Sequence, residues 1–233
     1  MKKKIGISFT TTNFQYYWNW FAPEDLLDDV ELVNLSFEEK NLNDMASCDG
    51  FVLTGGVDVH PSLYGGAINY ENSPVTHQPE RDAFEEKIYR YSQTNNLPML
   101  GICRGLQLIN VLEGGKLIQD LSDGNAMHRK TETDKEHLLT VTKDSLLYQI
   151  TGLSSGIVNS AHHQAIDPQT VGKNLQVNAL AHNDQCIEGI EWKDKAGKAF
   201  LLAIQWHPER MQDKQTNPFS RKIKERFLQE IRK

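Results

Sequence analysis

Residues Pro98–Asn110, PMLGICRGLQLIN, carry the pattern from which the fold is predicted. A short apolar run typical of a β-strand passes directly into a helical pattern, and a cysteine stands at the junction as Gly101-x-Cys103-x-Gly105. This is the form of a nucleophile elbow with sulfur in place of a serine hydroxyl. Such a tight turn presses the flanking positions against neighbouring backbone, which favours glycine. The dipole of the following helix stabilises a thiolate at Cys103. The alternative is a small buried hydrophobe, the usual role of a lone cysteine.

Composition excludes several classes of protein. The chain has 233 residues, 39% hydrophobic and 24% charged, which fits a single globular domain over residues 1–233. A net charge of −6 argues against a nucleic-acid partner. We expect no membrane partner, because no apolar run approaches a bilayer span. The basic N-terminus lacks the apolar core of a signal peptide, and the three cysteines form no disulfide framework, so we expect a cytoplasmic protein.

Apolar strand-like runs alternate with helical or polar segments, which predicts an α/β fold. We expect a flavodoxin-like three-layer sandwich, with a mostly parallel central sheet, helices on both faces and a small antiparallel extension. Polar segments 57–80 and 122–136 are expected to be surface loops, and the aromatic-rich segment 10–29 a helix or packed loop whose exposed face could support a homodimer. Strands are expected at 4–9, 30–35, 49–56, 98–102, 137–141, 175–181, 187–193 and 199–206, the last two forming a hairpin, and helices at 81–92, after Cys103 and from Pro218.

A cysteine nucleophile needs a base, usually a histidine oriented by a third polar group. Among eight histidines, His207 directly follows an apolar strand and is followed by Pro208-Glu209. Proline favours an extended chain, on which residues two apart point the same way. Glu209 is therefore expected to bond one ring nitrogen of His207 and leave the other facing the sulfur. An isolated His-Pro-Glu is more often a surface turn, but its coincidence with the cysteine turn favours function.

Acyl transfer also needs hydrogen-bond donors for the developing oxyanion. The Arg104 N–H begins the helix after the cysteine and is one expected donor. The Gly55-Gly56 turn supplies a second, for which we favour Gly56 and keep Gly55 or Val57 as alternatives. Gln107 lies one helical turn after the cysteine, where its amide can contact a substrate, although a helical glutamine is commonly a surface residue.

His162-His163-Gln164 forms a second polar cluster. Adjacent histidines suggest a metal, but consecutive side chains point apart and no carboxylate lies at ligand spacing. We therefore expect these residues to contact substrate, and we expect neither a metal nor a cofactor. Ordinary surface or loop positions are expected for His60, His77, His128, His137 and His182, and packing roles for Cys48 and Cys186.

With these residues in hand, the chain resembles class I glutamine amidotransferase-like cysteine hydrolases. Within them it is most similar to the γ-glutamyl-γ-aminobutyrate hydrolase branch, peptidase family C26. The resemblance implies a catalytic triad of Cys103, His207 and Glu209, a thioester intermediate and a small-molecule γ-glutamyl amide substrate. The matching segments, in order, are LTGGVDV at 53–59, GICRGLQ at 101–107, GGKLIQD at 114–120, VNSAHHQ at 158–164 and QWHPE at 205–209.

Two parts of the chain depart from that branch. The first fifty residues carry a shortened, aromatic-rich helix, and residues 181–188 differ from the usual Asp-Gly turn. The leaving amine is therefore left open. Two other functions also stay open: a glutaminase component that supplies ammonia to a separate synthase, and a non-catalytic protein that binds an amino-acid-like ligand.

Overall fold

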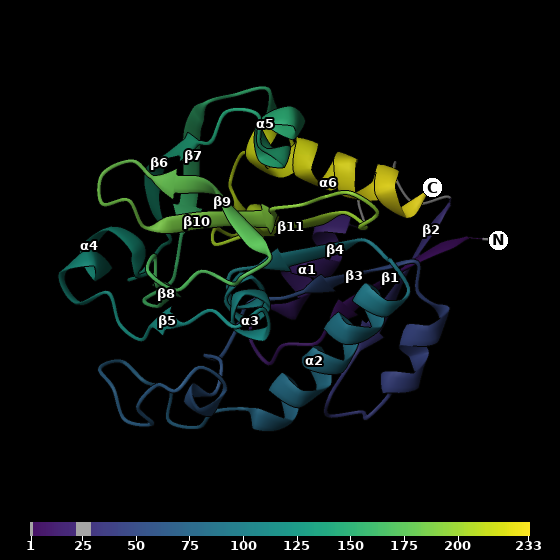
Figure 1. The fold of residues 1–233 in the computed structure, drawn as a ribbon, viewed down its shortest axis with the longest axis horizontal. Helices are drawn as coiled ribbons and strands as arrows, with labels where there is room; N and C mark the ends of the chain where they lie inside the picture. Colours follow the sequence, from purple (N-terminus) through teal and green to yellow (C-terminus); the bar gives the residue numbers. More distant parts are fainter. Residues whose placement is uncertain (1, 22–28) are drawn as a thin grey trace.

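A nine-stranded sheet runs through the centre of the computed structural model, which describes residues 2–21 and 29–233 (Figure 1). The strand order is β2-β1-β3-β4-β11-β10-β9-β6-β7, and β5 pairs with β8 in a separate small sheet. The strands are β1 (Lys3–Ser8), β2 (Val30–Leu35), β3 (Gly50–Leu53), β4 (Met99–Ile102), β5 (Leu117–Ile118), β6 (Lys135–Val141), β7 (Ser155–Ser160), β8 (Ala165–Ile166), β9 (Leu175–Ala181), β10 (Ile187–Trp192) and β11 (Leu201–Ile204).

The sheet has a parallel and an antiparallel half. β2, β1, β3, β4 and β11 are parallel neighbours. β10 pairs antiparallel with β11 as the expected hairpin, and β9, β6 and β7 continue the antiparallel pairing. The predicted α/β architecture is confirmed, and its antiparallel extension takes up the four strands from β10 to β7.

Helices cover both faces of the sheet because successive strand residues point to opposite sides. In β4, Leu100 and Ile102 pack in the cluster that contains α1, α5 and α6. Met99 points the other way, into the cluster that contains α2 and α3. The helices are α1 (Phe14–Phe21), α2 (Pro79–Thr94), α3 (Arg104–Leu112), α4 (Asn125–His128), α5 (Leu146–Thr151) and α6 (Pro218–Ile231), with 3-10 helices η1 (Leu42–Ser47), η2 (Pro61–Leu63), η3 (Ser122–Gly124) and η4 (Pro208–Arg210).

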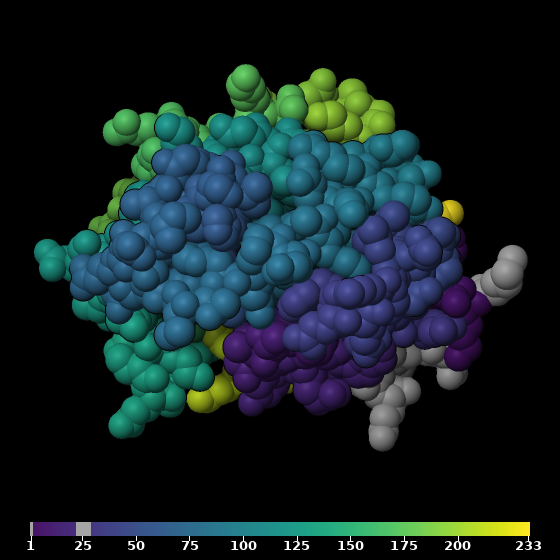
Figure 2. Space-filling model, turned by 90° about the horizontal axis from the view of Figure 1, so that it is seen from below, coloured from purple at the N-terminus to yellow at the C-terminus, as the bar shows by residue number. Residues whose placement is uncertain are grey.

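Segment 122–136 differs from the expected loop. It contains η3, α4 and the start of β6. Helical turns of three or four residues are too short to show a periodic apolar pattern, so they could not be predicted from the sequence. Segment 57–80 is mostly irregular, as expected, and forms a continuous patch of surface in Figure 2.

The aromatic segment near the N-terminus is helical over α1. Tyr17, Trp20 and Phe21 are buried in the core, whereas Tyr16 is exposed. Residues 22–28, part of the same expected element, lie outside the described residues. Within the part of the chain that the structure describes, no helix has the length and apolar character needed to cross a bilayer.

Candidate active site

Cys103 occupies the turn between β4 and α3. Its φ of 53° and ψ of −106° lie in a region that non-glycine residues rarely adopt. A Cβ added at Gly105 would lie 2.3 Å from the carbonyl oxygen of Leu53, and one at Gly101 would lie 3.0 Å from the carbonyl carbon of Gly105. Close backbone approach thus explains Gly105, whereas a Cβ on Gly101 would also meet the Ile109 side chain at 2.7 Å.

His207 and Glu209 follow β11, the strand next to β4 in the sheet. His207 Nδ1 lies 2.8 Å from Glu209 Oε1, so the expected contact forms. The chain from His207 to Glu209 is not extended, contrary to our expectation. Pro208 begins the 3-10 helix η4, and the fixed φ of proline fits the first turn of such a helix. The backbone N–H of His207 donates to Asn159 Oδ1 at 3.1 Å, which fixes the main chain just before η4.

Cys103 and His207 meet over Gly55. A Cβ built on Gly55 would lie 3.4 Å from Cys103 Cβ and 3.0 Å from His207 Cε1. Burial disfavours a charged imidazole, but Glu209 and Cys103, the latter also through a side-chain hydrogen bond, raise the pKa of His207 to about 9. The structure therefore brings the three residues of the expected triad together.

Tyr17 is a member of this group that sequence reasoning missed. Its hydroxyl accepts a hydrogen bond from the Gly55 N–H at 3.0 Å and lies 3.4 Å from His207 Nδ1. Burial, followed by the charge of Glu209, raises the pKa of Tyr17 well above its usual value, so the hydroxyl is neutral. The sequence showed Tyr17 only as one aromatic among several, with no spacing that linked it to His207.

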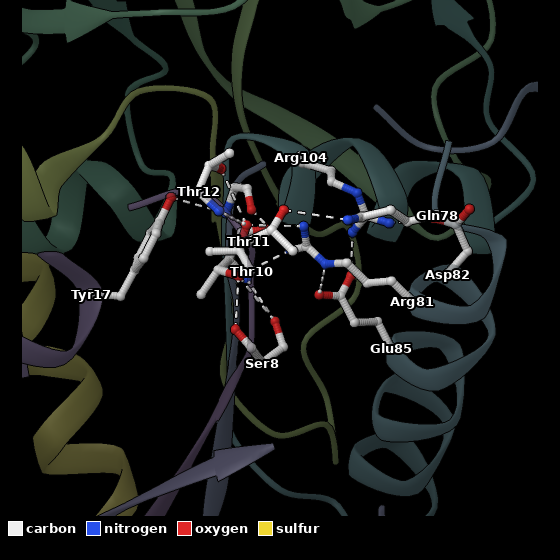
Figure 3. A network of polar contacts seen from close by, with 12 residues as sticks. Ser8, Thr10, Thr11, Thr12, Tyr17, Gln78, Arg81, Asp82, Glu85 and Arg104 are labelled. Atoms are coloured by element: carbon white, nitrogen blue, oxygen red, sulfur yellow. Dashed lines mark hydrogen bonds and ion pairs between the residues drawn. The ribbon is translucent and has the colours of Figure 1, made fainter. Parts of the chain in front are cut away.

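Helix α2 supplies an arginine to the same glycine turn. Fully buried Arg81 donates from Nη2 to the carbonyl oxygens of Gly55, at 2.9 Å, and Thr54, at 3.2 Å (Figure 3). In a planar trans peptide the N–H points opposite to the carbonyl, so the bond to the Gly55 oxygen fixes the direction of the Gly56 N–H. A Cβ on Gly56, whose φ is +132°, would lie 2.5 Å from Arg81 Nη1.

These contacts distinguish between the expected oxyanion donors. The Gly55 N–H is already donated to Tyr17. Among the described residues, no acceptor takes the N–H of Gly56 or of Arg104. Within the described residues, Gly56 and Arg104 therefore keep their backbone N–H groups free, that of Arg104 directly after Cys103, whereas the Gly55 N–H is occupied.

The side chain of Arg104 joins α3 to α2. Its guanidinium pairs with both Asp82 and Glu85, and Glu85 also pairs with Arg81 at 3.0 Å (Figure 3). All four side chains are at most 4% exposed. One buried charge network therefore holds both the glycine turn and the first residue of α3.

Gln107 and Gln164 lie side by side next to the turn. Gln107 Nε2 donates to the Gln164 carbonyl oxygen at 3.1 Å and lies 3.2 Å from Gln205 Oε1. Gln164 Nε2 donates to the carbonyl oxygen of Gln119 at 3.1 Å. Both side chains are buried. The alternative interpretation of Gln107 as an ordinary surface residue is therefore wrong.

The neighbouring histidines point apart, as expected. His163 bridges two carboxylates, with Nε2 3.1 Å from Asp58 and Nδ1 3.1 Å from Asp120. Burial opposes its charge, but these carboxylates raise its pKa. Because Asp58 belongs to segment 57–80, His163 anchors that segment beside the sheet. His162 points instead toward Glu188, with 3.4 Å between Nε2 and Oε1.

Two histidines that we expected on the surface are buried. His128 is 0% exposed and His137 is 7% exposed, and both face Glu188 on β10. Their partner is distant in the sequence, so no local pattern marked them. Cys186 and Cys48 are buried, in line with their expected packing roles.

Comparison with known proteins places this geometry in context. The family model described as Peptidase C26 matches residues 32–209. The glutamine amidotransferase-like protein YvdE of Lactococcus lactis is 39% identical over 210 residues, which cover 88% of this chain and 83% of the relative. The γ-glutamyl-γ-aminobutyrate hydrolase PuuD of Escherichia coli is 30% identical over 172 residues, covering 69% of this chain and 64% of PuuD.

A solved structure shows the same fold. The glutaminase domain of Trypanosoma brucei CTPS, solved with bound acivicin, superposes with a TM-score of 0.66 at 14% identity. The match covers 99% of this chain and 94% of that domain. The likeness therefore extends over the parallel and antiparallel halves of the sheet.

Proposed function

The chain belongs to the Peptidase C26 family, and from this premise, together with the site geometry, we propose that it is a cysteine-dependent hydrolase of γ-glutamyl amides. The observation that carries the proposal is the position of His207 between Glu209 and Cys103, over Gly55. A buried imidazole held by a carboxylate beside an elbow cysteine is the arrangement that acyl transfer through sulfur requires.

In the first half of the reaction, the Cys103 thiolate attacks the γ-carbonyl carbon of the substrate. The Gly56 and Arg104 N–H groups stabilise the oxyanion that forms. When it collapses, the carbon–nitrogen bond breaks and His207 gives its proton to the leaving amine. The product is a γ-glutamyl thioester on the enzyme together with a free amine.

In the second half, water attacks the thioester carbon and His207 accepts the proton. The carbon–sulfur bond breaks, glutamate leaves and the thiolate is restored. Glu209 fixes the ring of His207 and stabilises its charged form, and general acid–base help of this kind contributes about 10²–10⁴-fold in rate. No step uses a metal or a cofactor.

The amine side of the substrate is proposed from similarity and position. PuuD, by its name, cleaves γ-glutamyl-γ-aminobutyrate, which favours an amine that carries a carboxylate. We assign the surrounding contacts to Gln107, His163 and Gln164, whereas His162, first expected among them, faces Glu188 instead. His163 also anchors segment 57–80, which makes that segment the structural element best placed to determine the amine.

The second candidate function is a glutaminase that supplies ammonia to a separate synthase. The name of YvdE and the likeness to a CTPS glutaminase domain favour it. The chemistry at Cys103 is the same, but glutamine is the substrate. Glutamine hydrolysis that becomes fast only in the presence of a synthase would identify this function.

The test is a panel of γ-glutamyl amides, including glutamine, with glutamate release as the readout. Wild type should release glutamate and show a γ-glutamyl adduct on Cys103 by mass spectrometry. Cys103→Ala should keep the fold and lose about 10³-fold or more of the activity. Cys48→Ala, at the other end of the sheet, is the matched control and should remain active. Ligand binding without any adduct would indicate the non-catalytic alternative, and wild-type turnover by Cys103→Ala would refute the mechanism.

A further inference from the structure

A second buried polar cluster lies in the antiparallel half of the sheet. Three histidines surround Glu188 of β10: His128 ends α4, His137 is in β6 and His162 follows β7. Cys186 precedes β10. All five side chains are at most 9% exposed. The proposed hydrolysis does not involve His128, His137, Cys186 or Glu188.

Several inward-facing atoms of this cluster lack hydrogen bonds among the described residues, although His128 Nδ1 lies 3.3 Å from Ser160 Oγ. Glu188 Oε1 lies 3.4 Å from Nε2 of both His137 and His162, and 3.6 Å from Nδ1 of His128. Within the described residues, neither Glu188 oxygen nor either of those Nε2 atoms has a partner with hydrogen-bond geometry. Buried polar atoms are costly to leave unpaired, so this arrangement requires an explanation.

The outward-facing nitrogens, by contrast, are well paired. His128 Nε2 lies 2.8 Å from Asp184 Oδ2, and His162 Nδ1 lies 2.9 Å from the Gln164 carbonyl oxygen. When the His162 ring is neutral, its outward donor leaves a lone pair on Nε2, which has no partner among the described residues. A lone pair facing the Glu188 carboxylate repels it unless a cation lies between them. Metal-binding histidines characteristically show this outer pairing to a carboxylate or a backbone carbonyl.

We propose that this cluster binds a divalent transition-metal ion, with His128, Cys186 and Glu188 as the central ligands. One ligand atom from each of these three residues lies within 4.8 Å of the other two. A tetrahedral zinc site with bonds of about 2.0–2.3 Å places its ligand atoms roughly 3.3–3.8 Å apart, so a modest contraction closes the site. The fourth ligand in this proposal is His162, whose Nε2 lies 3.4 Å from Glu188 Oε1 but outside that compact group, so its ring must move toward the other ligands on binding.

The chemistry of the ligands favours zinc. Imidazole, thiolate and carboxylate together suit Zn²⁺ better than the hard cations Mg²⁺ and Ca²⁺, which prefer oxygen alone. Burial of all four ligands describes a closed structural site with no position for substrate. The ion would join α4, β10 and the end of β7, so the proposal stands whether or not Cys103 is catalytic.

The test is elemental analysis of the full chain, purified without an affinity tag or chelator from zinc-supplemented medium. Wild type should hold about one zinc per chain. Chelator treatment should lower its Tm, and added Zn²⁺ should restore it. Co²⁺ should replace zinc and give the visible absorption of a tetrahedral site with a thiolate ligand.

Variants separate these ligands from adventitious binding. Glu188→Gln and Cys186→Ser should each lose most of the bound metal, whereas Cys48→Ser, the matched buried thiol outside the cluster, should retain it. If a ligand variant does not fold, chelation and reloading of wild type still decide the question. Wild type that holds no metal as purified and takes up neither Zn²⁺ nor Co²⁺ would overturn the proposal and identify the cluster as one held together by protons.

Discussion

Cys103 combines two unfavourable properties, a strained backbone and burial next to an imidazole. Its positive φ costs about 1–3 kcal/mol, which the surrounding packing must supply. In return, the sulfur lies at the first turn of α3, next to the free N–H of Arg104. The strain therefore belongs to the geometry of the site, because an ordinary strand-to-helix connection would carry the side chain elsewhere.

The charge on His207 leads to a pH prediction. Its pKa is about 9 in place of 6.5, so the ring keeps the proton that the leaving amine needs until the pH rises through about 9. We expect kcat/KM of wild type to fall above that pH. Glu209→Gln keeps a hydrogen-bond acceptor but removes the charge, so the descending limb should move to lower pH by about one unit or more.

The measurement is the pH dependence of kcat/KM on the best substrate of the panel. Exposed Glu39→Gln serves as the control and should match wild type. Superimposable profiles for wild type and Glu209→Gln would contradict the role given to the carboxylate.

Residues were predictable from the sequence where their function depends on local geometry. Cys103 between two glycines and His207 after a strand both carry a pattern of their own. Tyr17 does not, because it meets His207 across 190 positions of sequence. Glu188 and its histidines were missed for the same reason, and the carboxylate judged to be absent near His162 is supplied by β10.

At the scale of elements, α2 acts on two turns at once. Its Arg81 binds the Gly55 carbonyl, and its Asp82 and Glu85 bind Arg104. The sequence predicted this helix from an apolar stripe, but the polar positions of a helix do not reveal what they contact. The prediction that His207–Glu209 is extended was wrong for a related reason, because proline is compatible with the first turn of a helix as well as with an extended chain.

We predict that Arg81→Lys folds but loses catalytic efficiency. Lysine keeps the charge, yet its single nitrogen cannot reproduce the fork that holds Glu85 and the Gly55 carbonyl together. With the Gly55–Gly56 peptide free to rotate, kcat should fall on the order of 10- to 100-fold, with a smaller change in KM.

The matched control is Arg90→Lys on the same helix, where the arginine is 54% exposed, pairs with Glu86 at 3.6 Å and donates to the Leu112 carbonyl oxygen at 3.4 Å. It should behave as wild type in kinetics and in Tm. Equal kcat values for Arg81→Lys and wild type would show that the network does not hold the oxyanion donor.

At the scale of the whole molecule, the C-terminal helix α6 connects the two ends of the chain to the site. Ser220 Oγ accepts a hydrogen bond from Trp20 Nε1 of α1 at 3.0 Å and donates to the Pro208 carbonyl oxygen of η4 at 2.8 Å. Tyr17 lies in α1 and Glu209 lies in η4. The buried hydroxyl of Ser220 therefore connects the two elements that position these side chains.

Ser220→Ala should therefore lower the free energy of unfolding by about 1–3 kcal/mol, because it leaves two buried groups without a partner. Urea unfolding measures this loss. Ser47→Ala, which removes an exposed hydroxyl bonded to the Asp44 carbonyl, is the control and should change stability by less than about 0.5 kcal/mol. A Ser220→Ala chain as stable as the control would contradict this linkage.

The pairing of β4 with β11 has a consequence for how such a protein can change over time. Gly101 lies opposite Ala203 in this parallel pair, and the sulfur and the imidazole leave the sheet just beyond. The spacing between the two main chains, roughly 4.8 Å, places the turn after β4 beside the segment after β11, and no side-chain replacement alters that spacing. Under the proposed function, evolution or a protein engineer can therefore rebuild segment 57–80 to admit a new amine while Cys103 and His207 keep their relative position.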